Sequence, residues 1–201
     1  MIAYKGFNKD LESVMGDGKK ETCRFKAGET KEVSESKTVR SGFHCCEYPF
    51  ECLTYYPMNG KNRFFEVEAS GDIDEDETRI ACTRITLKKE LTPYSLALAA
   101  MRYMIMYQSR KGWETERQSV KAVTDEAVAL EPGNIAIARG ENPRVKGPEG
   151  SILGLLKDNG KEITGAALFV VDGDRDGRWM ELDTGKGVNK VKECTDERES
   201  D

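Results

Sequence analysis

The sequence predicts an α+β fold: an N-terminal antiparallel or split sheet with a buried helix, followed by a β-rich C-terminal part. Alternating apolar and polar residues over 63–69 and 80–87 indicate two paired strands. A Thr-Pro pair at 92–93 opens a long apolar segment, which indicates a helix. Short apolar runs with tight turns over 120–153 favour strands again, in the regular spacing of a short β-solenoid.

A change in the sequence pattern near Gly112, from a long apolar segment to short apolar runs with turns, predicts two domains. Residues 1–112 are expected to form the α+β domain, which carries a Gly-Phe-His-Cys-Cys-Glu segment and a Met-rich helix. Residues 113–194 are expected to form a β-rich domain, and residues 195–201 a flexible acidic tail. A chain of 201 residues is long enough for two small domains.

The first part of the chain has the pattern of short strands and turns. We expect strands at 2–7, 23–26 and 43–46, where aromatic or apolar residues are followed by turn residues. Pro49 has no amide hydrogen to donate to a sheet, so it should end the third strand. One or two helical turns are expected at 51–56.

Two longer strands and a helix should follow. The strands at 63–69 and 80–87 are expected to pair antiparallel, with an acidic loop at 72–77 between them. The helix should run from Pro93 to about Tyr107. Because it is apolar on most sides, we expect it to lie buried under the sheet, and a Met-rich partner or dimer surface is the alternative.

The C-terminal part carries two short apolar runs, 128–130 and 135–138, with a Pro-Gly turn between them. They predict a rudimentary solenoid of about three or four coils, with an ordinary hairpin as the alternative. Two further strands are expected at 166–171 and 178–182, joined by the Asp- and Gly-rich turn 172–177.

Composition bounds the environment and the partners. Charged residues make up 33% of the chain and the net charge is −5, which indicates a soluble protein and makes direct nucleic-acid binding an unfavourable reading. No apolar run approaches the length of a membrane span, and no signal peptide is recognisable, so we expect a cytoplasmic protein with reduced thiols. An acidic protein favours a partner with a basic surface.

The only histidine, His44, lies in a cysteine cluster, and it is the first candidate for chemistry. On a strand, His44 and Cys46 share one face while Phe43 and Cys45 share the other. A histidine beside a thiol can draw off its proton, which makes His44 and Cys46 the candidate catalytic pair. Buried small side chains beside a hydrogen-bonded histidine are the alternative, and with Cys52 the cluster falls short of the four ligands of most structural zinc sites.

An acidic run is the candidate binding surface. Its members are Asp72, Asp74, Glu75, Asp76 and Glu77. Such a run can dock a basic protein surface through electrostatic attraction, and an ordinary solvated loop is the alternative.

A second acidic segment resembles a calcium loop in its spacing. Carboxylates occupy loop positions one, three, five and twelve, namely Asp172, Asp174, Asp176 and Asp183. The flanking segments have the pattern of strands instead of helices, and a turn rich in Asp and Gly needs no ion. Calcium is therefore a weak candidate, and no resident metal or cofactor is expected.

Several segments stand in the order of a known family. Tyr-Lys-Gly-Phe at 4–7, the segment Gly42-Phe43-His44 with Cys46-Glu47 and Pro49, and Phe-Glu-Val-Glu-Ala-Ser-Gly at 65–71 together resemble an uncharacterised family of phage and prophage accessory proteins. The hallmark of that family is Gly-Phe-His-x-Cys-Glu-x-Pro, and the resemblance covers about residues 1–91. It implies a phage-encoded accessory role and assigns no catalytic residue.

The order of the first strands also looks like small ADP-ribosyltransferase domains. That likeness implies NAD as a cofactor in a split sheet, with a catalytic Glu for which Glu66 and Glu68 stand on a plausible strand. Lys5 stands where that superfamily prefers His or Arg, and its Ser/Thr strand motif is absent.

Three functions follow from these observations. The first is a phage-encoded protein that binds a host factor, for example an anti-CRISPR inhibitor of bacterial immunity. The second is an NAD-using enzyme with His44 in its pocket, and the third is a structural or assembly protein that forms oligomers. We favour the first because no complete catalytic site can be built from the sequence.

Overall fold

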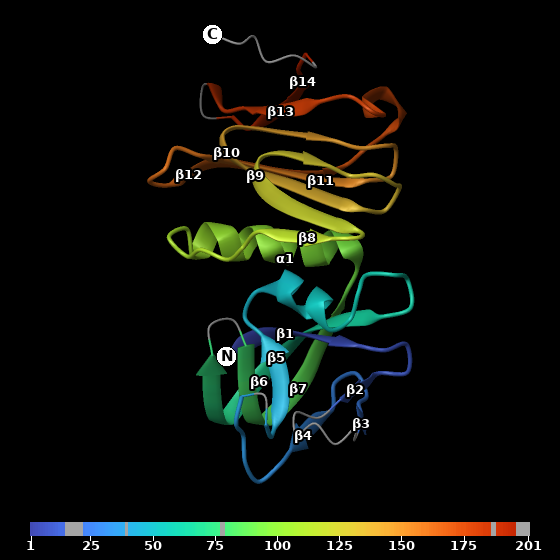
Figure 1. Cartoon of the computed structure of the whole chain (residues 1–201), viewed down its shortest axis with the longest axis vertical. Helices are drawn as coiled ribbons and strands as arrows, with labels where there is room; N and C mark the ends of the chain where they lie inside the picture. Colours follow the sequence, from blue (N-terminus) through green and yellow to red (C-terminus); the bar gives the residue numbers. More distant parts are fainter. Residues whose placement is uncertain (15–21, 39, 77–78, 186–187, 196–201) are drawn as a thin grey trace. The chain divides into compact units, whose positions relative to one another are not determined.

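The computed structural model describes residues 1–14, 22–38, 40–76, 79–185 and 188–195 (Figure 1). The chain divides into two compact units, Met1–Leu96 and Ala97–Asp201. The boundary expected near Gly112 lies inside the second unit. Of the predicted tail, residues 196–201 lie outside the described residues.

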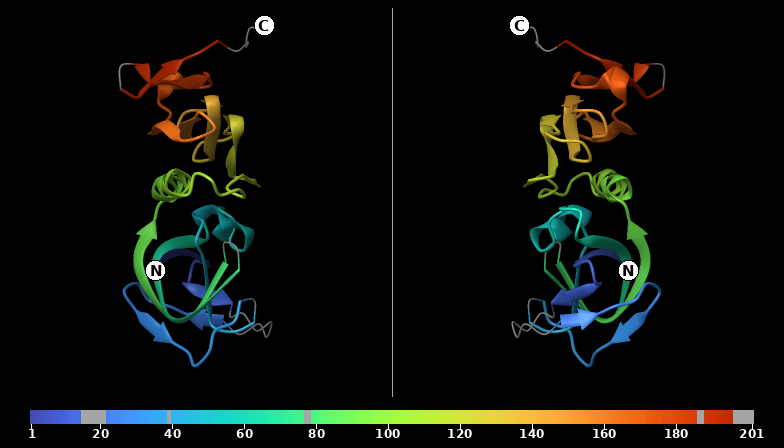
Figure 2. Two further views of the ribbon diagram at one scale, coloured as in Figure 1. Left: turned by 90° about the vertical axis from the view of Figure 1, so that its left-hand side faces the viewer. Right: turned by 90° about the vertical axis from the view of Figure 1, so that its right-hand side faces the viewer.

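The first unit is built from strands and one 3-10 helix. Its elements are β1 (Ile2–Phe7), β2 (Glu12–Val14), β3 (Thr22–Arg24), β4 (Thr30–Glu32), β5 (Phe43–Cys46), η1 (Pro49–Thr54), β6 (Arg63–Asp76) and β7 (Arg79–Leu91). Strands β1, β6, β7 and β5 pair antiparallel in a closed ring, because β7 pairs with both β5 and β6 and β1 joins β5 to β6. Figure 2 shows how strongly β6 and β7 curve to complete this ring.

The core of the first unit follows from the alternation of its strands. Aromatic and aliphatic side chains from every ring strand are fully or almost fully buried together. They include Phe7 of β1, Phe43 of β5, Phe65 of β6 and Ile85 of β7. Edge-to-face contacts join these rings, for example Phe7 to Phe65 with centroids 5.7 Å apart.

In its described residues, the second unit combines one α-helix and a short 3-10 helix with a single mixed sheet. Its elements are α1 (Pro93–Met106), which spans the boundary, β8 (Thr115–Arg117), β9 (Val120–Val128), β10 (Ile135–Lys146), β11 (Ile152–Asp158), β12 (Ile163–Val170), η2 (Gly173–Arg175), β13 (Met180–Asp183) and β14 (Lys190–Glu193). Strands β9, β10 and β11 are parallel, whereas β12, β13 and β14 pair antiparallel with their neighbours. Met101 of α1 packs on β11, where Gly154 leaves room: a Cβ there would lie 2.8 Å from the Met101 sulfur.

The predicted α+β class is wrong, because the described residues form a mostly β fold with one α-helix. The acidic segment predicted as a loop is a main reason. Residues 72–76 continue β6, and their backbone pairs with β7 from Cys82 down to Arg79. Backbone pairing along a neighbouring strand thus outweighs the weak strand preference of a charged sequence.

The predicted short β-solenoid is also wrong. In a solenoid every coil winds in the same direction, but here the chain reverses after β11. The turn at 159–162 causes the reversal: the Asn159 side-chain oxygen accepts the amides of Lys161 and Glu162, and Gly160 adopts a φ of +82°. The strand β12 therefore returns antiparallel along β11.

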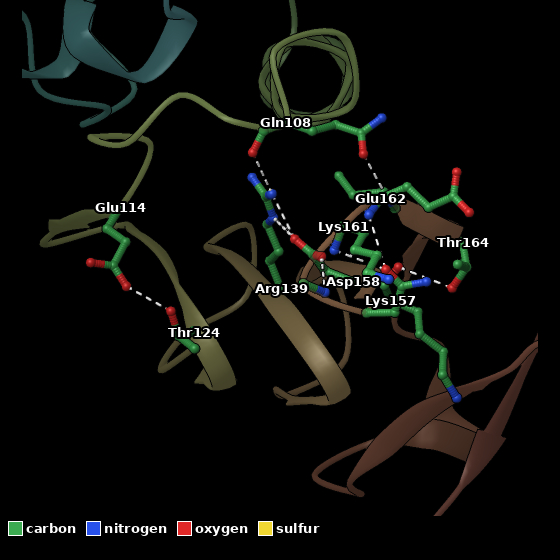
Figure 3. Close-up of polar contacts among 12 residues, drawn as sticks. Gln108, Glu114, Thr124, Arg139, Lys157, Asp158, Lys161, Glu162 and Thr164 are labelled. Atoms are coloured by element: carbon green, nitrogen blue, oxygen red, sulfur yellow. Dashed lines mark hydrogen bonds and ion pairs between the residues drawn. The ribbon is translucent and has the colours of Figure 1, made fainter.

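A buried ion pair fastens the segment after α1 to the sheet of the second unit (Figure 3). The Arg139 Nε atom lies 2.7 Å from the Asp158 carboxylate, and the two side chains are only 9% and 16% exposed. Arg139 also donates to the Gln108 carbonyl oxygen at 2.8 Å, and the Gln108 side chain accepts the Ile163 amide at 2.7 Å. Three segments far apart in the sequence therefore meet at one guanidinium.

In the described part of the chain, no helix has the length and apolar content needed to cross a membrane.

Replacing Asp158 with Asn should destabilise the second unit by about 3 to 5 kcal/mol, because the Arg139 charge stays buried without its counter-ion. Trp113 and Trp179 both belong to this unit, so urea unfolding followed by tryptophan fluorescence measures it. The exposed pair Arg178–Glu193 supplies the control: Glu193→Gln should leave the urea midpoint of the second unit nearly unchanged. Equal losses of unfolding free energy in the two variants would contradict a stabilising role for the Arg139–Asp158 pair.

Candidate functional site

The ring of the first unit opens between β1 and β5. Within these two fully described strands the ladder has one pair, Tyr4 with Cys46. Beyond it, the Lys5 ammonium donates a hydrogen bond to the His44 carbonyl oxygen at 2.5 Å. A side chain therefore joins the two strands where their main chains stop pairing.

Lys5 is an unusual residue for this position, because its alternation face on β1 is that of the core residues Ala3 and Phe7. It is 6% exposed, and its ammonium lies 5.5 Å from the centroid of the Phe7 ring. Among the described residues, no carboxylate lies within ion-pair distance of it. An ammonium has three N–H donors and the carbonyl uses one, so the buried charge is only partly compensated.

A pocket of about 780 Å³ opens at this point of the first unit. Its wall is formed by Tyr4, Lys5 and Gly6 of β1, Ser13 and Val14 of β2, His44, Cys45 and Cys46 of β5, Cys52 and Thr54 of η1, Tyr55, Tyr56 and Arg79. Among the described residues, Lys5 and Arg79 are the charged members of this wall, and it includes no carboxylate. The pocket is therefore lined by apolar, aromatic and cationic groups, which suits an anion with an apolar part.

Two tyrosines that follow η1 form one side of the pocket. Tyr56 packs directly on β1, and a Cβ at Gly6 would lie only 2.7 Å from its ring, so glycine is required there. The Tyr56 hydroxyl accepts the Val14 amide at 3.3 Å. Tyr55 is 54% exposed and hydrogen-bonds to Arg79, which also pairs with Asp76. The exposed side of the pocket is thus aromatic and carries a paired guanidinium.

His44 belongs to this pocket and is half-buried. Burial lowers the pKa of its imidazole below the ordinary value, and the positive charges of Lys5 and Arg79 lower it further. Hydrogen bonds to the backbone of Lys37 and Gly42 act in the opposite direction but do not reverse the shift. The imidazole is therefore neutral at pH 7, as a proton acceptor must be.

The buried cysteines near the pocket form two hydrogen-bonded thiol pairs. Cys52 donates to Cys46, and this bond together with burial raises the pKa of Cys52 well above its ordinary value. Cys45 donates to Cys82, and the same two causes raise the pKa of Cys45. In both pairs the sulfur that donates is held in its protonated form.

The predicted pair His44 and Cys46 thus lies in one pocket, on the face opposite the core residues Phe43 and Cys45. The cysteines 45, 46 and 52 all contribute to its wall. Sequence reasoning missed Lys5 as the central charge. The available signal was a lysine at a position of β1 where alternation expects a core residue.

The predicted acidic binding surface is used largely within the protein. Asp74 accepts the amide and the hydroxyl of Thr38, both at 2.7 Å, and these bonds lower its pKa. Asp72 accepts the Ser36 hydroxyl, and Asp76 pairs with Arg79. Glu75 is exposed, and Glu77 lies outside the described residues. A docking role for this segment stays a prediction.

The four carboxylates of the predicted calcium loop have different neighbours. Asp172 lies 3.5 Å from Arg175, Asp176 accepts the Glu149 amide, and Asp183 of β13 lies 3.9 Å from Lys192. Asp174 is exposed near Arg178. Within the described residues no group of three or more His, Cys, Asp or Glu is placed to hold a metal ion.

Comparison with known proteins gives one finding: residues 1–99 match a family model described as a domain of unknown function (DUF7666). The match covers the whole described pocket. No curated protein and no solved structure matches the chain. The predicted resemblance to phage accessory proteins therefore stays a prediction.

Lys5→Met should raise the pKa of His44, because it removes the nearest positive charge while the imidazole stays half-buried. As the only histidine, His44 gives one assignable imidazole signal, and its titration by proton NMR measures the pKa in each variant. The exposed Lys61→Met is the matched control and should leave the titration unchanged. An identical pKa in wild type and Lys5→Met would refute the coupling.

The first unit should lose stability as the pH falls below about 7, through the range in which His44 takes up a proton. The folded pKa of His44 lies below its unfolded value of about 6.5, so the unfolded chain takes up the proton first. The stability is complete above the unfolded pKa and is lost as the pH falls through the folded one. Urea unfolding, followed by NMR signals of β1 and β5 at several pH values, measures this loss of stability. The loss with falling pH should be smaller in His44→Gln than in the wild type. Equal pH dependence in the two proteins would contradict a contribution from His44.

Proposed function

We propose that the first unit binds a small anionic ligand of nucleotide size in the Lys5 pocket. The observation that carries this proposal is the buried Lys5 ammonium, which has one carbonyl partner and no carboxylate among the described residues. An isolated buried charge is costly, and a bound anion offsets that cost.

The charge of the pocket wall supports an anion. Lys5 keeps two N–H donors beyond its bond to the His44 carbonyl. Arg79 adds a guanidinium at the exposed side, where its charge is shared with Asp76. Phosphate and carboxylate groups accept charge-assisted hydrogen bonds from both kinds of donor.

The size and the walls support a ligand with a ring. A volume of about 780 Å³ falls within the range of about 300 to 1,000 Å³ that small-molecule sites occupy. Tyr55 and Tyr56 offer aromatic surface beside the cations, and Val14 adds an apolar wall. A nucleotide-like molecule, with a charged end and a flat end, meets both requirements.

Binding has more support than group transfer. The NAD-using transferase predicted as an alternative needs a carboxylate at its reacting centre, but Glu66 and Glu68 are not part of the pocket wall. Glu68 instead pairs with Lys88 at 2.5 Å. His44 and Cys46 remain the groups to consider if a reaction takes place.

Interception of a host factor, the function favoured by the sequence, is compatible with a ligand pocket but does not depend on it. The basic-surfaced host partner, the anti-CRISPR role and the cytoplasmic location stay proposals. A nucleotide-binding role is a narrower proposal than host-factor interception, since it depends only on the residues of one pocket.

Addition of AMP or NAD⁺ should shift the His44 imidazole signal saturably, because the ligand would lie beside it. Inorganic phosphate should shift it more weakly, since it offers no ring to Tyr55 and Tyr56. Lys5→Met should weaken AMP binding about tenfold or more, as expected for a lost charge-assisted bond. Lys61→Met should bind like the wild type.

Arg79→Gln provides a second variant that leaves the interior unchanged, and it should weaken binding less than Lys5→Met. The proposal fails if none of the three probes gives a saturable shift. It also fails if Lys5→Met, with its NMR spectrum otherwise preserved, binds AMP as tightly as the wild type.

A further inference from the structure

Four cysteines of the first unit are buried and reduced, and they lie in two pairs around β5. Alternation sends Cys45 to the core face of the strand and Cys46 to the opposite face. Cys45 donates its thiol hydrogen to Cys82 of β7, and Cys52 of η1 donates to Cys46. One sequence position along β5 thus separates two dithiols in different surroundings.

The pair Cys46–Cys52 belongs wholly to the pocket wall. Both residues line the pocket, with exposed fractions of 5% and 2%, so the pocket is the route by which a reagent reaches their sulfur atoms. Six positions separate them in the sequence, and a thiol hydrogen bond already holds the two sulfur atoms close. Closeness of the two sulfur atoms is the first requirement for an intramolecular disulfide.

The pair Cys45–Cys82 is less accessible. Cys82 does not line the pocket, lies in the ring core and donates to the Phe43 carbonyl oxygen at 3.5 Å. The pair therefore serves as an internal comparison: Cys45 also lines the pocket, but its partner Cys82 lies in the ring core away from the opening.

The exposure of the two thiols sets the order of attack. Cys46 lies on the pocket-facing side of β5 and is 5% exposed, whereas Cys52 of η1 is 2% exposed. A reagent that enters the pocket therefore reaches the Cys46 sulfur first.

We propose that Cys46 and Cys52 form a reversible disulfide when a small-molecule disulfide such as oxidised glutathione enters the pocket. The proposal is independent of the anionic ligand, since it needs only the opening and the two thiols. It assigns a redox-modification site to the first unit.

The reaction proceeds in two exchanges. The Cys46 thiolate attacks one sulfur of oxidised glutathione, whose S–S bond breaks and releases one glutathione thiolate. Cys52 gives its proton to water and attacks the Cys46 sulfur of the mixed disulfide, which releases the second glutathione thiolate. The two protein thiols are oxidised and one glutathione disulfide is reduced to two thiols.

The test uses the full chain with Cys23 and Cys194, the two half-exposed cysteines, changed to Ser. The folded protein is incubated with excess oxidised glutathione, then unfolded, alkylated and digested for mass spectrometry. We expect a loss of two hydrogens and a Cys46–Cys52 cross-link, with Cys45 and Cys82 alkylated. Dithiothreitol should restore the original mass.

Variants test the order of attack. Cys52→Ser should stop at a glutathione adduct on Cys46, and Cys46→Ser should give neither adduct nor cross-link. The matched control Cys82→Ser should still form the Cys46–Cys52 cross-link at a similar rate. A cross-link between Cys45 and Cys82, or an unmodified Cys46 after prolonged incubation, would overturn the proposal, and mapping the parent chain decides this even where a variant fails to fold.

Discussion

The hydrogen bond from the Lys5 ammonium to the His44 carbonyl oxygen is the interaction on which the first unit depends. It joins β1 to β5 where their ladder ends after the pair Tyr4–Cys46, and so it completes the ring of four strands. The same charge acts on the groups around it: it disfavours the imidazolium of His44 and favours the thiolates of the nearby cysteines. The Lys5 ammonium nitrogen therefore contributes both to the closure of the ring and to the chemistry of the pocket. A change at Lys5 should affect the ring, the pocket and the acid–base state of His44 together.

Much of the local structure was predictable because it rests on local rules. The strand at Phe43–Cys46 and the helix that starts at Pro93 lie where alternation and the Thr-Pro start place them. The same alternation placed His44 and Cys46 on one face. What the sequence could not supply were pairings between distant segments. The extension of β6 through Asp76 depends on β7, and the reversal after β11 depends on the four-residue turn 159–162. The pocket joins residues from Tyr4 to Arg79, and no local pattern encodes such a meeting.

The strand β5 shows how one short segment can serve two purposes. Its inward residues Phe43 and Cys45 complete an apolar core in which the aromatic rings of Phe25 and Phe43 meet edge to face. Its outward residues His44 and Cys46 carry the polar and nucleophilic atoms of the pocket. Substitution of His44 or Cys46 therefore changes the pocket, substitution of Phe43 changes the core, and Cys45 belongs to both.

Closure of the ring has a consequence for behaviour at high concentration. A strand at the edge of an open sheet presents unpaired main-chain groups that can template pairing with another molecule. In the first unit each ring strand has a neighbour on both sides, so the ring conceals these groups without charged or proline-protected edges. The gap between β1 and β5 is the weak point, and a single ammonium covers it. The protection of the main-chain groups between β1 and β5 therefore depends on one side chain, whereas β4 and the β2–β3 pair keep open edges outside the ring.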